Sequence, residues 1–204
     1  MSEDALTPVD VRDCYGEPSV LARDKVMPRL DGHARAFIAR SPFVVLGTAD
    51  ADGRQDVSPR GDPPGFVRVL GERTLALPDR PGNRRIDSLA NVASQPNVAL
   101  LFIVPGFDDT LRVNGRARIS RDPDLLASLA VDGKPALSAL VVEVEEVFMH
   151  CAKAFIRSRL WKPDAQQNRR EFPSLGRIIA DQVAGVDAAA ADVAIDENYR
   201  TELY

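Results

Sequence analysis

The chain has 204 residues, of which 45% are apolar and 27% charged, and its formal net charge is −4. These values are typical of one globular domain with additional terminal segments, and the acidic balance disfavours nucleic acid as a partner. No apolar run approaches the roughly 18 residues of a membrane helix, the N-terminus lacks the features of a signal peptide, and two distant cysteines indicate no disulfide framework, so we expect a cytoplasmic protein without membrane segments.

The first 40 residues predict an arm followed by helices. Residues 1–18 show little periodicity and are expected to form an extended N-terminal arm. Residues 19–40 have a helical spacing of apolar side chains, and Pro28 and Gly32 divide them into two short helices. Pro42 ends the second helix.

Strand patterns dominate the middle of the chain. Residues 43–49 and 55–58 flank an Asp-Gly turn signal and predict a hairpin, and residues 66–70 and 73–77 predict another. Further along, the pattern indicates strands at 98–104, 110–120 and 137–149, a short helix at 122–130, and helical structure at 173–194. Six or seven hairpin-linked strands favour a barrel, because closure removes exposed edges.

A helix is predicted at residues 84–94, in the middle of these strands. Its apolar positions recur with helical spacing, and Asn83 is a candidate N-cap. A bulge is expected at Gly115 in a later strand.

Two turn-rich segments concentrate arginine. SPRGD spans residues 58–62, and PDRPGNRR spans residues 78–85. Guanidinium groups and free backbone N–H groups at loop corners favour anion binding. A phosphorylated cofactor is therefore the first functional hypothesis.

The order of these motifs resembles a known family. A strand, DADG, a strand, SPRGD, a hairpin, LPDRPGNRR, a helix, strands with RVNGRA, and HCAKAFIRSRLW together resemble the pyridoxamine 5′-phosphate oxidase-like, FMN-binding split β-barrel proteins, in a bacterial branch of unassigned substrate. The resemblance implies a mainly β fold with flanking helices, an FMN-binding split β-barrel of about six to seven strands. It divides the chain into an N-terminal arm (1–18), a barrel domain (19–163) and a helical tail (164–204) that packs on the barrel or on a partner subunit.

The same resemblance implies a homodimer with FMN sites between the subunits. The chain departs from true pyridoxamine 5′-phosphate oxidases, because SPRGDPPGF stands where their arginine-rich flavin strand would lie. The C-terminal region that helps those enzymes to bind the B6 phosphate is not recognisable. The fold and the cofactor are therefore better supported than the substrate.

Arg84 and Arg85 are candidates for binding the FMN phosphate. They lie at the predicted helix start, where backbone N–H groups and guanidinium groups can neutralise a dianion, and by position they resemble the family's basic pair. The alternative is a solvated first turn, although two cations there oppose the helix dipole at a cost of roughly 0.3–1 kcal/mol each. Asp79 and Asn83 belong to the same motif and are expected to contact the cofactor.

Ser58, Pro59, Arg60 and Gly61 form the second candidate group. Pro59 fixes the local backbone and Gly61 permits a flat ring to approach closely. In the family this segment lines the isoalloxazine edge and the ribityl chain. The alternative is a tight turn with a surface arginine.

Two further groups leave their alternatives open. Thr110 and Arg112 alternate with apolar residues, so their shared strand face meets the flavin, the partner subunit or solvent. Lys153 and Trp161 belong to a basic, aromatic segment that either closes the flavin cleft or anchors a dimer interface.

His150 and Cys151 suggest a metal ligand pair or a nucleophile, but both interpretations are weak. The chain has only two histidines, and neighbouring strand residues point to opposite faces. We expect no metal site and nominate no catalytic residue.

The predicted function is FMN-dependent oxidoreduction of a small molecule by hydride transfer at flavin N5, with NAD(P)H as a possible partner. Two alternatives remain: a deazaflavin-dependent reductase in the same fold, and a flavin-binding protein without turnover of its own.

Overall fold

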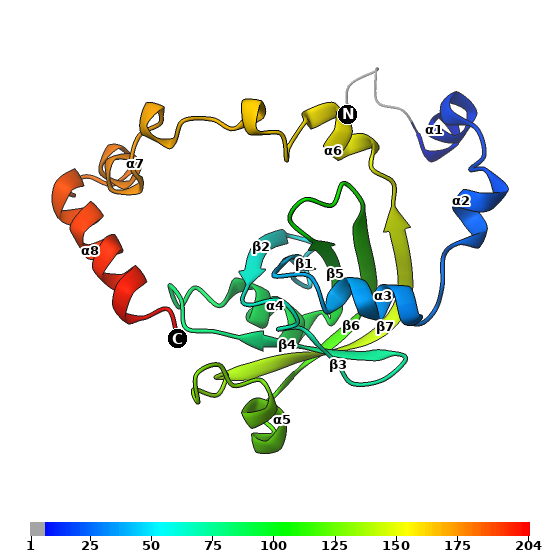
Figure 1. Cartoon of the computed structure of the whole chain (residues 1–204), viewed down its shortest axis with the longest axis horizontal. Coiled ribbons are helices and arrows are strands. Elements are labelled where there is room, and N and C mark those ends of the chain that lie inside the picture. Colours follow the sequence, from blue (N-terminus) through cyan, green and yellow to red (C-terminus); the bar gives the residue numbers. More distant parts are fainter. Residues whose placement is uncertain (1–6) are drawn as a thin grey trace.

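The computed structural model describes residues 7–204 and centres on a seven-stranded antiparallel sheet in the order β2-β1-β5-β6-β7-β4-β3 (Figure 1). The predicted split β-barrel is confirmed, although backbone pairing does not close it: β2 and β3 remain the two edges. The strands are β1 (Phe43–Ala49), β2 (Gln55–Gly61), β3 (Arg68–Val69), β4 (Thr74–Asp79), β5 (Asn97–Ile103), β6 (Thr110–Ser120) and β7 (Ser138–His150).

The core lies inside the curled sheet. Alternate residues of each strand point inward, such as Val44 and Leu46 on β1, and both are fully buried. Helix α3 (Gly32–Ile38) contributes Phe37 and Ile38 to the same core, together with strand residues that include Leu100, Phe102, Leu111, Val113 and Val142. Burial of these apolar side chains is the main contribution to the stability of the barrel.

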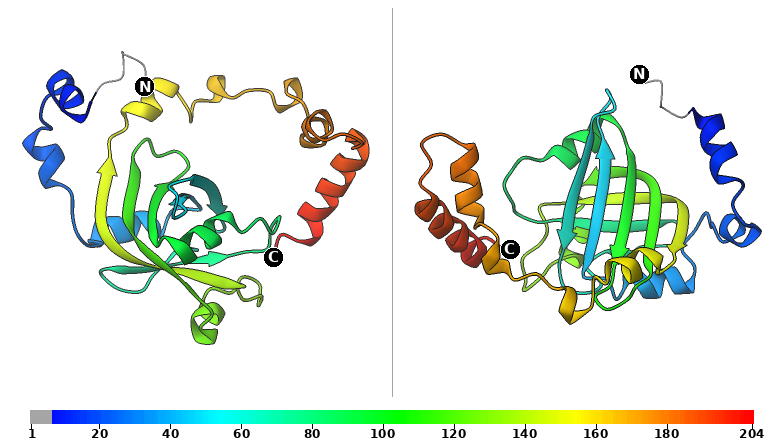
Figure 2. Two further views of the ribbon diagram at one scale, coloured as in Figure 1. Left: turned by 180° about the vertical axis from the view of Figure 1, so that it is seen from behind. Right: turned by 90° about the horizontal axis from the view of Figure 1, so that it is seen from above.

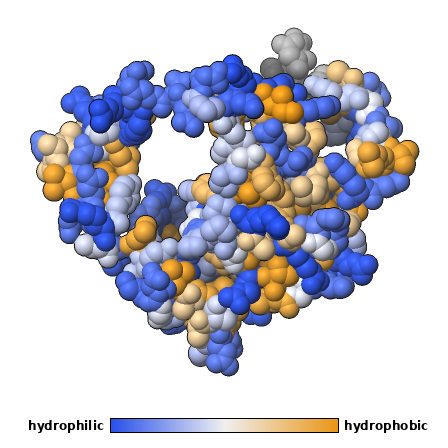
Figure 3. All heavy atoms as spheres, in the orientation of Figure 1, coloured by the Kyte–Doolittle hydropathy of each residue, from blue (hydrophilic) through white to orange (hydrophobic). Residues whose placement is uncertain are grey.

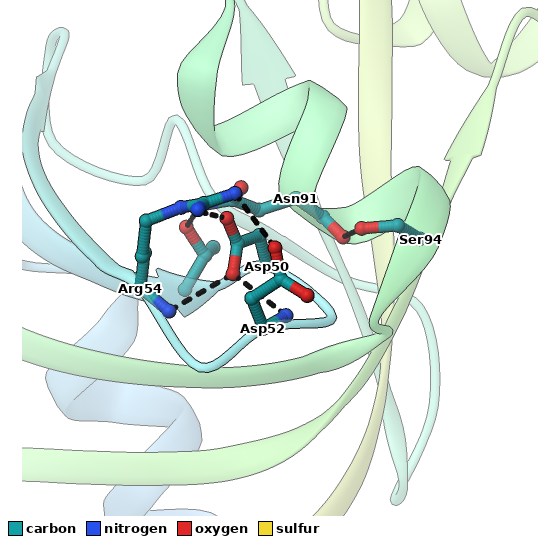
Figure 4. A network of polar contacts seen from close by, with 6 residues as sticks. Asp50, Asp52, Arg54, Asn91 and Ser94 are labelled. Carbon is teal, nitrogen blue, oxygen red and sulfur yellow. Dashed lines mark hydrogen bonds and ion pairs between the residues drawn. The ribbon is translucent and has the colours of Figure 1, made fainter.

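The β1–β2 hairpin forms where the Asp-Gly signal predicts it. Asp50 Oδ1 accepts hydrogen bonds from the backbone N–H groups of Asp52 and Arg54, and Arg54 Nε donates to Asp50 Oδ2 at 2.8 Å (Figure 4). These bonds, led by the one from the Arg54 backbone, lower the pKa of Asp50. Helix α4 (Asp87–Ser94) is fastened beside the hairpin, because Asn91 Nδ2 donates to the Thr48 hydroxyl at 3.0 Å.

The predicted bulge at Gly115 is confirmed. The β6–β7 register shifts between Asn114 and Gly115, and a Cβ on Gly115 would lie 2.0 Å from the Glu143 carbonyl oxygen. Only glycine allows the two strands to approach this closely.

The prediction that residues 1–18 form an extended arm is wrong for the part of this segment that the structure describes. Residues 1–6 lie outside the described residues, but α1 (Pro8–Tyr15) is a helix that begins with a reciprocal capping box between Thr7 and Asp10. Helix α2 (Val20–Asp24) follows it. None of the residues in these two helices is buried, which explains why no apolar periodicity marked the first of them.

The chain beyond β7 leaves the barrel. It forms α6 (Lys153–Ser158), short turns at Pro163–Ala165 and Arg169–Glu171, and a hairpin of α7 (Leu175–Gln182) and α8 (Ala188–Thr201); α5 (Pro123–Ser128) lies between β6 and β7. The tail and the N-terminal helices lie on opposite sides of the barrel (Figure 2). An opening separates the tail from the barrel in the space-filling view (Figure 3), and the ribbon diagram places the C-terminus beside the barrel (Figure 1). No helix within residues 7–204 is long and apolar enough to cross a bilayer.

Candidate functional site

The main cavity lies at the seam of the barrel, where β2 and β4 face each other without pairing. Its volume is about 900 Å³, which suits a cofactor-sized ligand. Its walls come from β2, the end of β4, the loop before α4 and the end of the chain; they include Ser58, Pro59, Arg60, Gly61, Asp79, Arg80, Asn83, Arg84, Ile86, Leu89 and Tyr204. We call this cavity the seam pocket.

Two ion pairs bridge the seam in place of backbone hydrogen bonds. Arg60 Nη1 donates to Asp79 Oδ1 at 2.7 Å, and Arg80 Nε donates to Asp62 Oδ2 at 2.7 Å. The side chain of Asp62 is only 1% exposed, so its charge depends on these donors. The ends of β2 and β4 thus each supply one arginine and one carboxylate, and the two pairs join these strand ends across the seam.

A chain of hydrogen bonds through Ser58 and Ser88 also fixes the Arg60 side chain. Arg60 Nε donates to Ser58 Oγ at 3.1 Å, and that hydroxyl lies 3.1 Å from the hydroxyl of Ser88 in the first turn of α4. Ser88 Oγ donates in turn to Asp56 Oδ2 at 2.6 Å. This chain of hydrogen bonds joins β2 to α4 and orients the guanidinium group at the pocket wall.

The loop before α4 has an unusual backbone. Arg84 and Ile86 both have positive φ angles, of 61° and 54°, a region that β-branched residues such as Ile86 rarely adopt. Ile86 is also the N-cap, and it offers no side-chain hydrogen bond to the first N–H groups of α4. The predicted helix start at Arg84, capped by Asn83, is therefore wrong: α4 begins at Asp87, and Asn83 Oδ1 instead accepts from the Arg85 N–H.

The two neighbouring arginines of this loop differ. Arg84 lines the seam pocket, and its guanidinium makes no ion pair within residues 7–204. Arg85 does not line the pocket; its Nε donates to Asp87 Oδ2 at 2.8 Å, a hydrogen bond that raises the pKa of Arg85. The loop thus presents one uncompensated cation to the cavity beside the uncapped end of α4.

The structure gathers many of the predicted site residues around this one cavity. These are Ser58, Pro59, Arg60, Gly61, Asp79, Asn83 and Arg84. The β2 segment is not a turn that follows a short strand, because β2 continues through Gly61 as an edge strand, where Pro59 costs no pairing.

Arg112 lies elsewhere, on the outer face of the sheet. Its Nη2 donates to Glu146 Oε1 at 2.5 Å, and its guanidinium lies 5.0 Å from the centre of the Phe148 ring. Glu146 is eight residues along β7 from Ser138, whose backbone pairs with Asp79 at the seam, which is roughly 26 Å in an extended strand. We call the outward side chains of β1, β5, β6 and β7 the outer face.

The other three predicted residues also lie away from the seam pocket. Thr110 is 4% exposed at the start of β6. Trp161 Nε1 donates to the Phe107 carbonyl at 2.7 Å, and its ring stacks on Phe155. Lys153 is an exposed residue in the first turn of α6. Within one chain none of them lines the pocket, so their role in cofactor binding stays a prediction.

Three residues at the seam were not among the predicted contacts. Arg80 and Asp62 lie inside the two arginine-rich motifs, so their charge was a usable signal. Tyr204 donates from its hydroxyl to Asp62 Oδ1 at 2.6 Å, across 142 positions of sequence. No local sequence pattern predicts a contact between residues so far apart in the chain.

His150 lies at the end of β7, beside the cations of the outer face. Desolvation, followed by the charges of Arg112 and Lys25, lowers its pKa. Cys151 is an exposed free thiol. Within residues 7–204, no group of three or more His, Cys, Asp or Glu side chains is placed to hold a metal ion.

The comparisons with known proteins point to one family. A family model described as pyridoxamine 5′-phosphate oxidase matches residues 30–151, which include β1–β7 and the whole arginine-rich loop. No curated protein matches the chain.

Solved structures to which the chain is similar include HupZ of Group A Streptococcus, an F420 reductase, and the heme storage protein HutZ of Vibrio cholerae. HupZ is 17% identical, covering 59% of this chain and 93% of its own, with a TM-score of 0.47. The F420 reductase is 18% identical, covering 59% and 98%, with a TM-score of 0.43. HutZ is 14% identical, covering 60% and 94%, with a TM-score of 0.42.

Proposed function

The chain belongs to the pyridoxamine 5′-phosphate oxidase family, and on that premise we propose that its seam pocket binds FMN and that the bound flavin oxidises or reduces a small molecule. One observation carries the proposal. The uncompensated guanidinium of Arg84 and the uncapped N-terminus of α4 face the same cavity as the apolar side chains that a flat ring would contact.

The residues present fit a phosphorylated, planar group. Backbone N–H groups at the start of α4, the left-handed turns at Arg84 and Ile86, and the Arg84 cation form an anion-binding end. Phe66, Ile86 and Leu89 give the cavity an apolar part. Such a division of polar and apolar walls is typical of cofactor sites.

When bound, FMN supplies hydride transfer at its N5, and the protein supplies binding and electrostatics. In this assignment Arg84 holds the phosphate by charge-assisted hydrogen bonds. Arg60, fixed by Ser58 and Asp79, places a cation at the wall of the cavity, where it stabilises negative charge on a bound ligand. Pro59 and Gly61 also line the cavity, and neither adds a long side chain to its wall.

We also propose that the protein is a homodimer that uses the outer face. Val45, Leu101, Arg112 and Phe148 lie in one register row across four strands. Arg112 Nε and Asn114 Oδ1 are buried without a hydrogen-bond partner among the described residues. Val45, Leu101 and Phe148 are only partly buried, and a row of partly exposed apolar side chains is what a partner subunit would cover.

Spectroscopy of the purified protein tests this function. We expect a flavin absorbance spectrum, release of FMN identified by its mass, and bleaching of the spectrum by NADH or NADPH without oxygen. A stable yellow protein that neither nucleotide bleaches would favour a flavin-binding protein without turnover. A colourless protein that takes up only a deazaflavin would favour the deazaflavin reductase, and one that takes up neither would contradict the proposal.

A further inference from the structure

The end of the chain forms part of the seam pocket, although it is separated from the barrel by about forty residues of tail. Glu202, Leu203 and Tyr204 lie among the lining residues. The tail between Lys162 and Ser174 is mostly exposed, and α7 and α8 pack mainly on each other. The wall that the chain end supplies is therefore built from outside the barrel.

Tyr204 is held at this wall by several contacts. Its hydroxyl donates to Asp62 Oδ1 at 2.6 Å, and the Arg80 guanidinium lies 5.6 Å from the centre of its ring. Lys134 Nζ donates to the Tyr204 backbone oxygen at 3.2 Å. Among the described residues, the hydrogen bonds between residues 164–204 of the tail and residues 43–150 of the barrel all involve Tyr204.

These contacts link Tyr204 to the ion pairs of the seam. Asp62 receives donors from both Arg80 and Tyr204, so the same carboxylate closes the barrel and docks the tail. The hydroxyl is occupied by that bond, and the ring remains as cavity surface. An aromatic ring in this position offers a planar ligand a stacking or edge contact.

We propose that Tyr204 is a positioning residue of the flavin site: docked on Asp62 and Arg80, it supplies an aromatic wall that the bound flavin contacts. This inference rests on the proposed function. Because the docked ring contacts the flavin in this assignment, docking of the tail and binding of FMN strengthen each other, and linkage makes the two factors equal.

The test is an FMN titration of the unmodified 204-residue protein and three variants. Tyr204→Ala should weaken FMN binding about tenfold, the upper range of one aromatic contact. Tyr204→Phe keeps the ring but loses the bond to Asp62, so it should show a smaller loss. Tyr199→Ala is the matched control, since Tyr199 is 59% exposed on α8, the helix that precedes Tyr204, and does not line the seam pocket.

Tryptic cleavage after Arg169 and Arg170, in the exposed part of the tail, gives an independent measurement of docking. FMN should slow this cleavage in the unmodified protein and in Tyr199→Ala, but not in Tyr204→Ala. Equal FMN affinity in the unmodified protein and Tyr204→Ala would overturn this inference and leave the proposed function standing. Failure of the unmodified protein to bind FMN would overturn the proposed function, and this inference with it.

Discussion

The seam pocket and the outer face both carry arginine, and they differ in how the chain places it. At the seam, Arg60, Arg80 and Arg84 come from strand ends and a loop, and they converge on one cavity. On the outer face, Arg112 lies within the long strand β6, two residues after its start, and pairs within the sheet. Arginines at strand ends reach a shared cavity because several strands end together, whereas an arginine within a strand is confined to the face that alternation gives it.

This difference between the two regions assigns them different roles, ligand binding at the seam pocket and subunit contact at the outer face. The seam has one arginine without a carboxylate partner, which suits an anionic ligand. The outer face has partly exposed apolar side chains, Val45, Leu101 and Phe148, which suit a second protein surface. The following predictions test whether the two regions behave so differently.

The largest expected effect is structural. Arg80→Ala leaves the Asp62 carboxylate, 1% exposed, without its cation, and removal of one partner from such a pair costs about 3–5 kcal/mol. Chemical denaturation measures the change in free energy of unfolding. Arg177→Ala is the control, because it breaks an exposed pair within α7 that is expected to contribute at most about 0.5 kcal/mol. Similar losses in the two variants would mean that the seam pair does not hold the barrel edges.

The next effect concerns the outer face. Val45→Lys places a charge in the apolar register row and should weaken self-association about tenfold or more. Light scattering over a dilution series measures this, and Val193→Lys, on the exposed surface of α8, is the control. A dimer that tolerates Val45→Lys and not Val193→Lys would place the subunit interface on the tail.

A smaller effect is expected from His150. Its pKa is lowered in the folded protein, first by desolvation and then by Arg112 and Lys25, so the unfolded chain binds a proton more readily. The stability that the neutral imidazole contributes is present above pH 6.5, the ordinary value, and is lost as the pH falls below it. His150→Gln should flatten the decline in thermal stability as the pH falls below neutral, which thermal unfolding at a series of pH values measures.

The sequence predicts most of the barrel because its strands have strong local signals. Residues 110–120 are predicted and observed as the same strand, since apolar and polar side chains alternate over its length. The end of β2 was harder to predict because Pro59 and Arg60 resemble a turn, yet an edge strand accepts both. Helix α1 was missed because it buries nothing, although its capping box can be read from Thr7 and Asp10.

The site was predictable to the extent that it is local. The arginine-rich motifs indicate an anion site, and the cavity does collect many of their residues. The sequence does not predict that Arg84 lines the pocket while Arg85 pairs with Asp87, because this difference depends on a left-handed turn and on the bond to Asp87. The contribution of Tyr204 depends on tertiary contacts alone.

The affinities of FMN and riboflavin for Arg84→Ala test the central claim most directly. Loss of a charge-assisted bond to the phosphate should weaken FMN by about 1.5–3 kcal/mol and change riboflavin, which has no phosphate, very little. Arg85→Ala is the matched control, because its guanidinium pairs with Asp87 and lies off the pocket; it should affect FMN less. An equal loss for FMN and riboflavin in Arg84→Ala, or no loss for either, would contradict the assignment of the seam pocket as the phosphate-binding flavin site.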